Sequence, residues 1–130
     1  MTGVVRLITE EQSSVSIETV EALRAGVAPE FWSEFLEDVA FGLTRDLAAL
    51  ERAMVDRDAN AAHKVVKRLA KAAAGVGLTE LAHVTYQLED VIAQRDPVAT
   101  AAVAARVLRM GGQSLIALVQ ADTPPEVPAG

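Results

Sequence analysis

Apolar positions recur every three or four residues along most of this chain, which is the spacing of one face of an α-helix. The period-two alternation typical of strands does not occur. Each helix presents an apolar face that needs a partner, so the pattern predicts an all-α fold, an antiparallel up-and-down four-helix bundle with a short extra N-terminal helix. The predicted helices span residues 16–24, 29–54, 58–77, 79–92 and 97–119.

Capping residues mark the boundaries of these helices. Asp58 and Asp96 each stand directly before a helical stretch, as N-caps do, and Pro97 suits a first helical turn. Gly77 ends one helix, and Thr79 is predicted to cap the next. The connections are short, so successive helices are predicted to be antiparallel neighbours.

The periodic part of the chain predicts one domain over residues 15–120. Residues 1–14 show no sustained period and are predicted to be a mobile leader. Residues 121–130 contain three prolines and are predicted to be a disordered tail. There is no cysteine, no signal peptide and no uninterrupted apolar run long enough to cross a bilayer, which favours a soluble cytoplasmic protein with no membrane partner.

The last predicted helix, 97–119, is apolar on more than one side and contains Gly111 and Gly112 next to each other. Glycine inside a helix costs up to about 1 kcal/mol relative to alanine, so a kink or a close helix contact is predicted there. A buried, alanine-rich helix is the simplest interpretation. The alternative is a self-association surface, which would make the protein a structural, dimer-forming bundle.

Residues 58–77 predict a helix with one apolar and one basic face. This segment contains four cations and one acid, for a charge of +3, whereas the whole chain has 12 basic and 18 acidic residues and a net charge of −6. The rest of the chain therefore carries −9. A basic strip on an acidic body indicates an acidic partner without naming it, and it offers too few cations for nucleic acid.

The order of helices and several spacings resemble the histidine-containing phosphotransfer (HPt) domain of bacterial multistep phosphorelays. That family has an acidic residue that opens its second helix, an H-x-L-K-G-S motif nine residues later, a glycine ten residues after the histidine, and then L-A and L-E pairs. The matching positions, between about residues 17 and 119, are Asp58, Leu69, Gly77, Leu81-Ala82 and Leu88-Glu89.

The resemblance fails at the motif itself. The phosphorylatable histidine falls on Lys67, and the lysine, glycine and serine of the motif fall on Ala70, Lys71 and Ala72. A lysine amine is protonated at pH 7 and has no lone pair with which to attack phosphorus. The resemblance therefore implies a pseudo-HPt module that docks on a response-regulator receiver domain or a sensor histidine kinase without being phosphorylated itself.

In this hypothesis Lys67 is the central anchor that enters an acidic receiver pocket, other cations steer the partner, and small residues allow close approach. An alternative is a competent phosphotransfer protein that uses His63, one helical turn earlier on the same face. The predicted partner-binding residues are His63, Lys64, Lys67, Arg68, Ala70, Lys71 and Ala74.

Other chemistry has little support in the sequence. His83 is predicted to be an exposed, inert residue of helix 79–92, and neither histidine has the ligand spacing of a metal site. No catalytic triad or carboxylate pair is recognisable. We therefore expect no cofactor and no metal, and a binding or phosphocarrier module in place of an enzyme.

Overall fold

The computed structural model describes residues 17–122, and all of its secondary structure is helical. The prediction of an all-α fold is confirmed for this part of the chain, which contains no strand. In chain order the elements are α2 (Ile17–Ala25), the 3-10 helix η1 (Pro29–Phe31), α3 (Trp32–Val55), α4 (Ala59–Gly75), α5 (Thr79–Ala93) and α6 (Pro97–Asp122).

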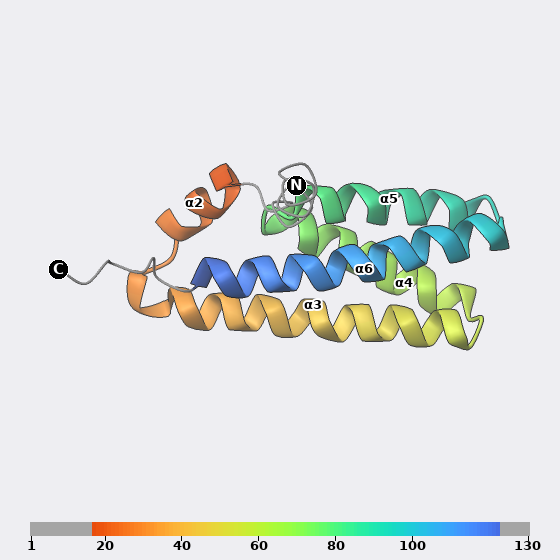
Figure 1. The fold of residues 1–130 in the computed structure, drawn as a ribbon, viewed down its shortest axis with the longest axis horizontal. Coiled ribbons are helices and arrows are strands. Elements are labelled where there is room, and N and C mark those ends of the chain that lie inside the picture. The colour runs from red at the N-terminus through yellow and green to blue at the C-terminus, as the bar shows by residue number, and fades with distance from the viewer. Residues whose placement is uncertain (1–16, 123–130) are drawn as a thin grey trace, which may run out of the picture.

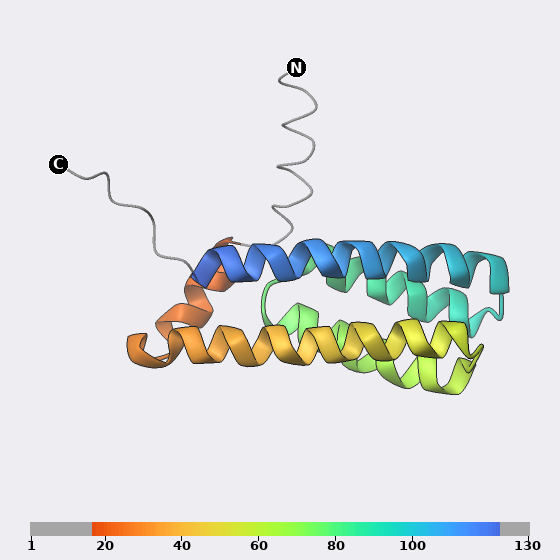
Figure 2. The same cartoon turned by 60° about the horizontal axis from the view of Figure 1, so that its bottom comes forward.

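The four long helices pack against one another, and each of them contacts two others. α3 contacts α4 and α6, and α5 contacts the same two helices, as the two views show (Figures 1 and 2). The apolar stripes predicted from the sequence meet in one core. Its largest fully buried apolar side chains are Leu43, Leu50, Val66, Leu69, Leu78, Leu81, Val84, Leu88, Val107 and Leu118.

The short helix α2 packs beside the N-terminal end of α3 (Figure 1). The guanidinium carbon of Arg24 lies 5.4 Å from the ring centroid of Trp32, a cation–π geometry. Trp32 in turn stacks on Phe35, with 5.7 Å between the ring centroids. Val20 and Leu23 of α2 pack against the edge of the core, so α2 extends the apolar interior at this end.

Two of the predicted N-caps are confirmed by their hydrogen bonds. The carboxylate of Asp58 accepts from the backbone N–H of Ala61 at 3.0 Å, and Asp96 accepts from that of Ala99 at the same distance. The predicted cap at Thr79 is wrong, because Thr79 is already the first residue of α5 and no side chain caps that helix. Leu78 occupies the cap position and is fully buried, so apolar packing fixes the start of α5.

The adjacent glycines of α6 mark a close helix contact, and α6 continues unbroken through them. A Cβ atom on Gly111 would lie 2.6 Å from both Cδ atoms of Leu47 in α3, whereas one on Gly112 would meet nothing within 4 Å. Of the two predicted explanations, close packing holds for Gly111. Gly112 lies on the exposed side of the helix.

Several predictions about the ends of the chain lie outside the described residues. These are the mobile leader at 1–14 and the part of the tail after Asp122, where α6 ends. By length and composition alone, Pro97–Gln120 of α6 is apolar enough to cross a membrane, and 28% of that window is buried against the rest of the protein. The core helix of a soluble protein meets the same criterion, so the cytoplasmic location stays a prediction.

The two glycines give a matched pair of substitutions. We expect Gly112→Ala to raise the free energy of unfolding by about 0.5–1 kcal/mol, because alanine is the better helix former and its Cβ has room. Gly111→Ala should instead lower it by about 1 kcal/mol, because Leu47 must move in a packed core. Urea titration followed by circular dichroism measures both, and equal stabilisation by both variants would contradict the close contact.

Candidate functional site

The basic face of α4, defined as Lys64, Lys67, Arg68 and Lys71, lies on the surface. All four residues are exposed, and the apolar face of the same helix is buried in the core. Lys67 therefore points away from the interior, as the sequence predicts for a docking anchor. Among the described residues Lys64, Lys67 and Lys71 form no ion pair, so their charges are available to a partner.

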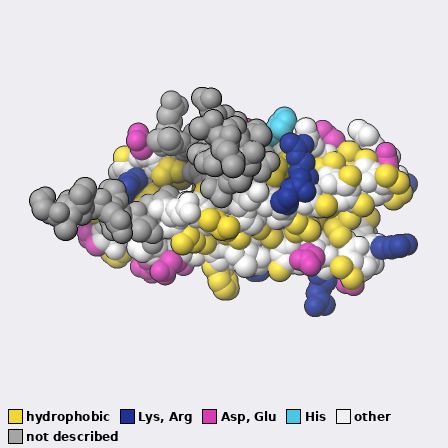
Figure 3. Space-filling view, in the orientation of Figure 1, with side chains coloured by type: hydrophobic (Ala, Val, Ile, Leu, Met, Phe, Trp, Pro, Cys, Tyr) yellow, Lys and Arg dark blue, Asp and Glu magenta, His cyan; other side chains and the backbone are white. Residues whose placement is uncertain are grey.

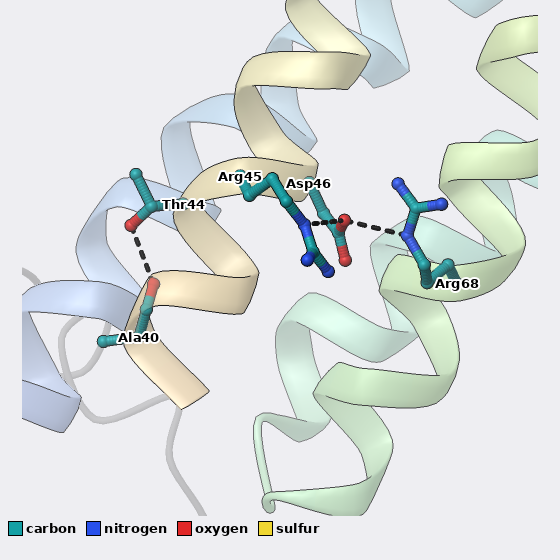
Figure 4. Close-up of polar contacts among 5 residues, drawn as sticks. All are labelled: Ala40, Thr44, Arg45, Asp46 and Arg68. Atoms are coloured by element: carbon teal, nitrogen blue, oxygen red, sulfur yellow. Dashed lines mark hydrogen bonds and ion pairs between the residues drawn. The ribbon is translucent and has the colours of Figure 1, made fainter. Parts of the chain in front are cut away.

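Arg68 differs from the three lysines because it is bound to a buried acid. Its Nε donates a hydrogen bond of 2.9 Å to Oδ1 of Asp46, which is 2% exposed on α3 (Figure 4). Arg45 approaches the same oxygen with its Nε at 3.6 Å. The carboxylate is thus paired by two cations, and the Arg68 bond joins α3 to α4.

Asp46 is not among the residues predicted from the sequence, although its position in the chain carries a signal. Asp46 stands within the apolar stripe of α3, three residues after Leu43 and four before Leu50, both of which are fully buried. A carboxylate at a core position needs a cation, because an unpaired buried charge is costly. Arg68 supplies that cation and so carries a structural role that the lysines of the basic face do not share.

One predicted contact residue is not on the surface. Ala70 is 1% exposed and cannot touch a partner, so its assignment to the partner-binding set is wrong. It follows Leu69 in the sequence, and both residues fall on the side of α4 that faces the neighbouring helices. Ala74 is exposed beside Lys71, and its role in the close approach of a partner stays a prediction.

His63 lies at the edge of the basic face and is half-buried. It lines a groove of about 1080 Å³ between the turn that joins α3 to α4 and the turn that joins α5 to α6. Both turns lie at the same end of the molecule (Figure 1). His63 therefore lines the groove, whereas Lys67 lies one helical turn further along α4 and is exposed.

The predicted exposure of His83 is confirmed, and its Nε2 lies 3.4 Å from Nε2 of Gln87 on the same helix. Within residues 17–122 no group of three or more histidine, cysteine or acidic side chains is arranged to hold a metal ion.

The outward face of α6 carries exposed apolar side chains together with the cations Arg106 and Arg109. Val98, Ile116 and Val119 are exposed, and hydrophobic side chains are visible along the surface over α6 and α3 (Figure 3). Dimerisation through this helix stays a prediction, since no feature of the described residues identifies what covers it.

Comparison with family models, with curated proteins and with solved structures found no match to this chain. The resemblance to HPt domains therefore remains a prediction from the sequence.

Removing Arg68 tests its structural role. We expect Arg68→Ala to lower the free energy of unfolding by about 1–3 kcal/mol, because the buried carboxylate of Asp46 loses its shorter charge-assisted hydrogen bond. Lys67→Ala, on the adjacent exposed position, should change it by less than about 0.5 kcal/mol. Chemical denaturation measures both variants.

The double variant Asp46→Leu/Arg68→Met is the control for that experiment. It removes both charges and should recover most of the lost stability, since no buried charge is then left unpaired. If Arg68→Ala is as stable as the parent, either the Asp46–Arg68 pair makes no net contribution to the free energy of unfolding, or Arg45 takes over the pairing with Asp46.

Proposed function

We propose that this protein is a degenerate HPt-like signalling module that docks on a receiver domain or a sensor histidine kinase without carrying phosphate itself. The observation that carries the proposal is the exposed position of Lys67, between Lys64 and Lys71, on a helix whose other side is buried. These lysines form no internal ion pair in the described part of the chain.

The packing of the four long helices supports this proposal. We infer that they form the antiparallel up-and-down bundle of the HPt type. The framework positions of the resemblance have structural roles: Leu69, Leu81 and Leu88 are fully buried, and Asp58 caps α4. The positions that depart from the motif include the exposed Lys67 and Lys71. The chain thus keeps residues that build the fold and has a lysine at the position where the family has its phosphorylatable histidine.

Charge complementarity explains how such a module would bind. Receiver active sites are acidic pockets, and a lysine that projects from the centre of a docking face can enter one as a counter-ion. Lys64 and Lys71 add attraction at longer range, although the whole chain is acidic. Arg68 contributes less than its charge suggests, because its guanidinium already binds Asp46.

Charge reversal at the centre of the basic face tests docking. We expect Lys67→Glu to slow association with a cognate receiver domain by about tenfold at low salt, and by much less near 1 M salt, where charges are screened beyond about 3 Å. Surface plasmon resonance against the receiver domains of the same organism measures both the rates and their salt dependence.

Arg106→Glu is the matched control, because it makes the same change in net charge at an exposed position on α6. It should leave receiver association close to that of the parent. Docking through the basic face is contradicted if Lys67→Glu and Arg106→Glu bind a genuine partner equally well.

Phosphotransfer through His63 is the second candidate function. It is favoured by one observation, that the imidazole shares its groove with the arginines Arg57 and Arg95, whose charges would stabilise a phosphoryl group. A competent carrier would take an acid-labile radioactive label from a phosphorylated receiver, and His63→Ala would remove that label. Absence of label in the parent, with receiver binding intact, is the outcome expected of the docking module.

A further inference from the structure

The groove at the end of the molecule is built by all four long helices. Met54 of α3, His63 of α4, Ile92 of α5 and Thr100 of α6 all line it, and each of these residues is half-buried. Most of the remaining lining consists of alanine and other apolar residues. Its volume of about 1080 Å³ is slightly above the range of about 300–1,000 Å³ that is usual for sites that hold small molecules.

Two arginines stand at the same position in the two turns beside this groove. Arg57 follows α3 and Arg95 follows α5, and their φ angles are 52° and 57°, in the left-handed region. The hydrogen-bond pattern is also the same. The N–H of Arg57 donates to the carbonyl of Met54 at 3.2 Å, and that of Arg95 donates to the carbonyl of Ile92 at 3.0 Å.

Glycine is the usual residue at this position, because any residue with a Cβ atom is destabilised in the left-handed region. The chain uses glycine for this purpose in the turn between α4 and α5, where Gly77 has a φ of 79°. Both turns at the groove use arginine instead. Each therefore gives up some stability and gains a long cationic side chain at the edge of an apolar groove.

The charges of these arginines are not used within the described structure. Neither guanidinium forms an ion pair there. The neighbouring acids, Asp58 and Asp96, accept hydrogen bonds from the first turns of α4 and α6. Asp58 and Asp96 also line the groove, but each carboxylate lies at the N-terminus of its own helix, where the helix dipole offsets part of its charge. The groups at the groove that can bind a negatively charged partner are therefore the two arginines and the imidazole of His63.

We propose that this groove binds a small amphiphilic anion, a molecule with an apolar body and one carboxylate. The apolar body lies among the ends of the four helices, against Met54 and Ile92. Arg57 and Arg95 hold the carboxylate by charge-assisted hydrogen bonds, and the imidazole of His63 can donate a further one. This site is separate from the basic face of α4, and the proposal does not depend on receiver docking.

The first experiment compares two probes that share an apolar chain, octanoate and 1-octanol. We expect octanoate to shift the backbone NMR signals of residues around the groove, including Arg57, His63 and Arg95, and to saturate. Octanol should bind at least about tenfold more weakly, because it lacks the carboxylate. Equal affinity for the two probes, no saturation, or shifts centred on the outer face of α6 would overturn the proposal.

The second experiment uses the left-handed backbone conformation of the two arginines. The double variant Arg57→Gly/Arg95→Gly should have a higher Tm than the parent, because glycine suits the left-handed region. It should also bind octanoate at least about tenfold more weakly, so loss of binding cannot be attributed to unfolding. Arg57→Lys/Arg95→Lys keeps the charges and should retain most of the affinity, and undiminished binding by the glycine variant would overturn the proposal.

Discussion

The burial of one side of α4 is the constraint on which the surface of this protein depends. Val66, Leu69 and Ala73 are fully buried, and burying a valine or leucine side chain contributes about 1.5–3 kcal/mol. Rotating the helix to hide its lysines would expose these residues. The packing of the core therefore also sets the direction in which Lys67 points, and the same apolar contacts that stabilise the fold present the basic face to solvent.

A second constraint, the pairing of Asp46 with Arg68, acts on this surface. A carboxylate that is 2% exposed requires a cation, and the nearest cation belongs to the basic face of the next helix. The 2.9 Å bond takes Arg68 out of the group of free charges and leaves three lysines. Four cations that look equivalent in the sequence thus divide into one structural residue and three that can meet a partner.

The turns at the two ends of the helical assembly differ in the type of residue that adopts a left-handed backbone conformation. Each of the three turns between the long helices contains a residue with a left-handed backbone, and this residue is glycine in one turn and arginine in the other two. The glycine turn stands next to the fully buried Leu78. The arginine turns border the groove, where the core ends and apolar side chains are half-buried. The difference in residue type thus follows the difference in surroundings.

The sequence by itself determined the features that depend on local physics. The helical period located the long helices, and the Asp58 and Asp96 caps could be predicted because a cap bonds to its own first turn. Only the tertiary structure decided that Ala70 is buried, that Asp46 binds Arg68, and that the Arg57 and Arg95 turns border one groove. Those features join residues far apart in the chain, and the period of a single helix specifies which face is apolar but not which neighbour covers it.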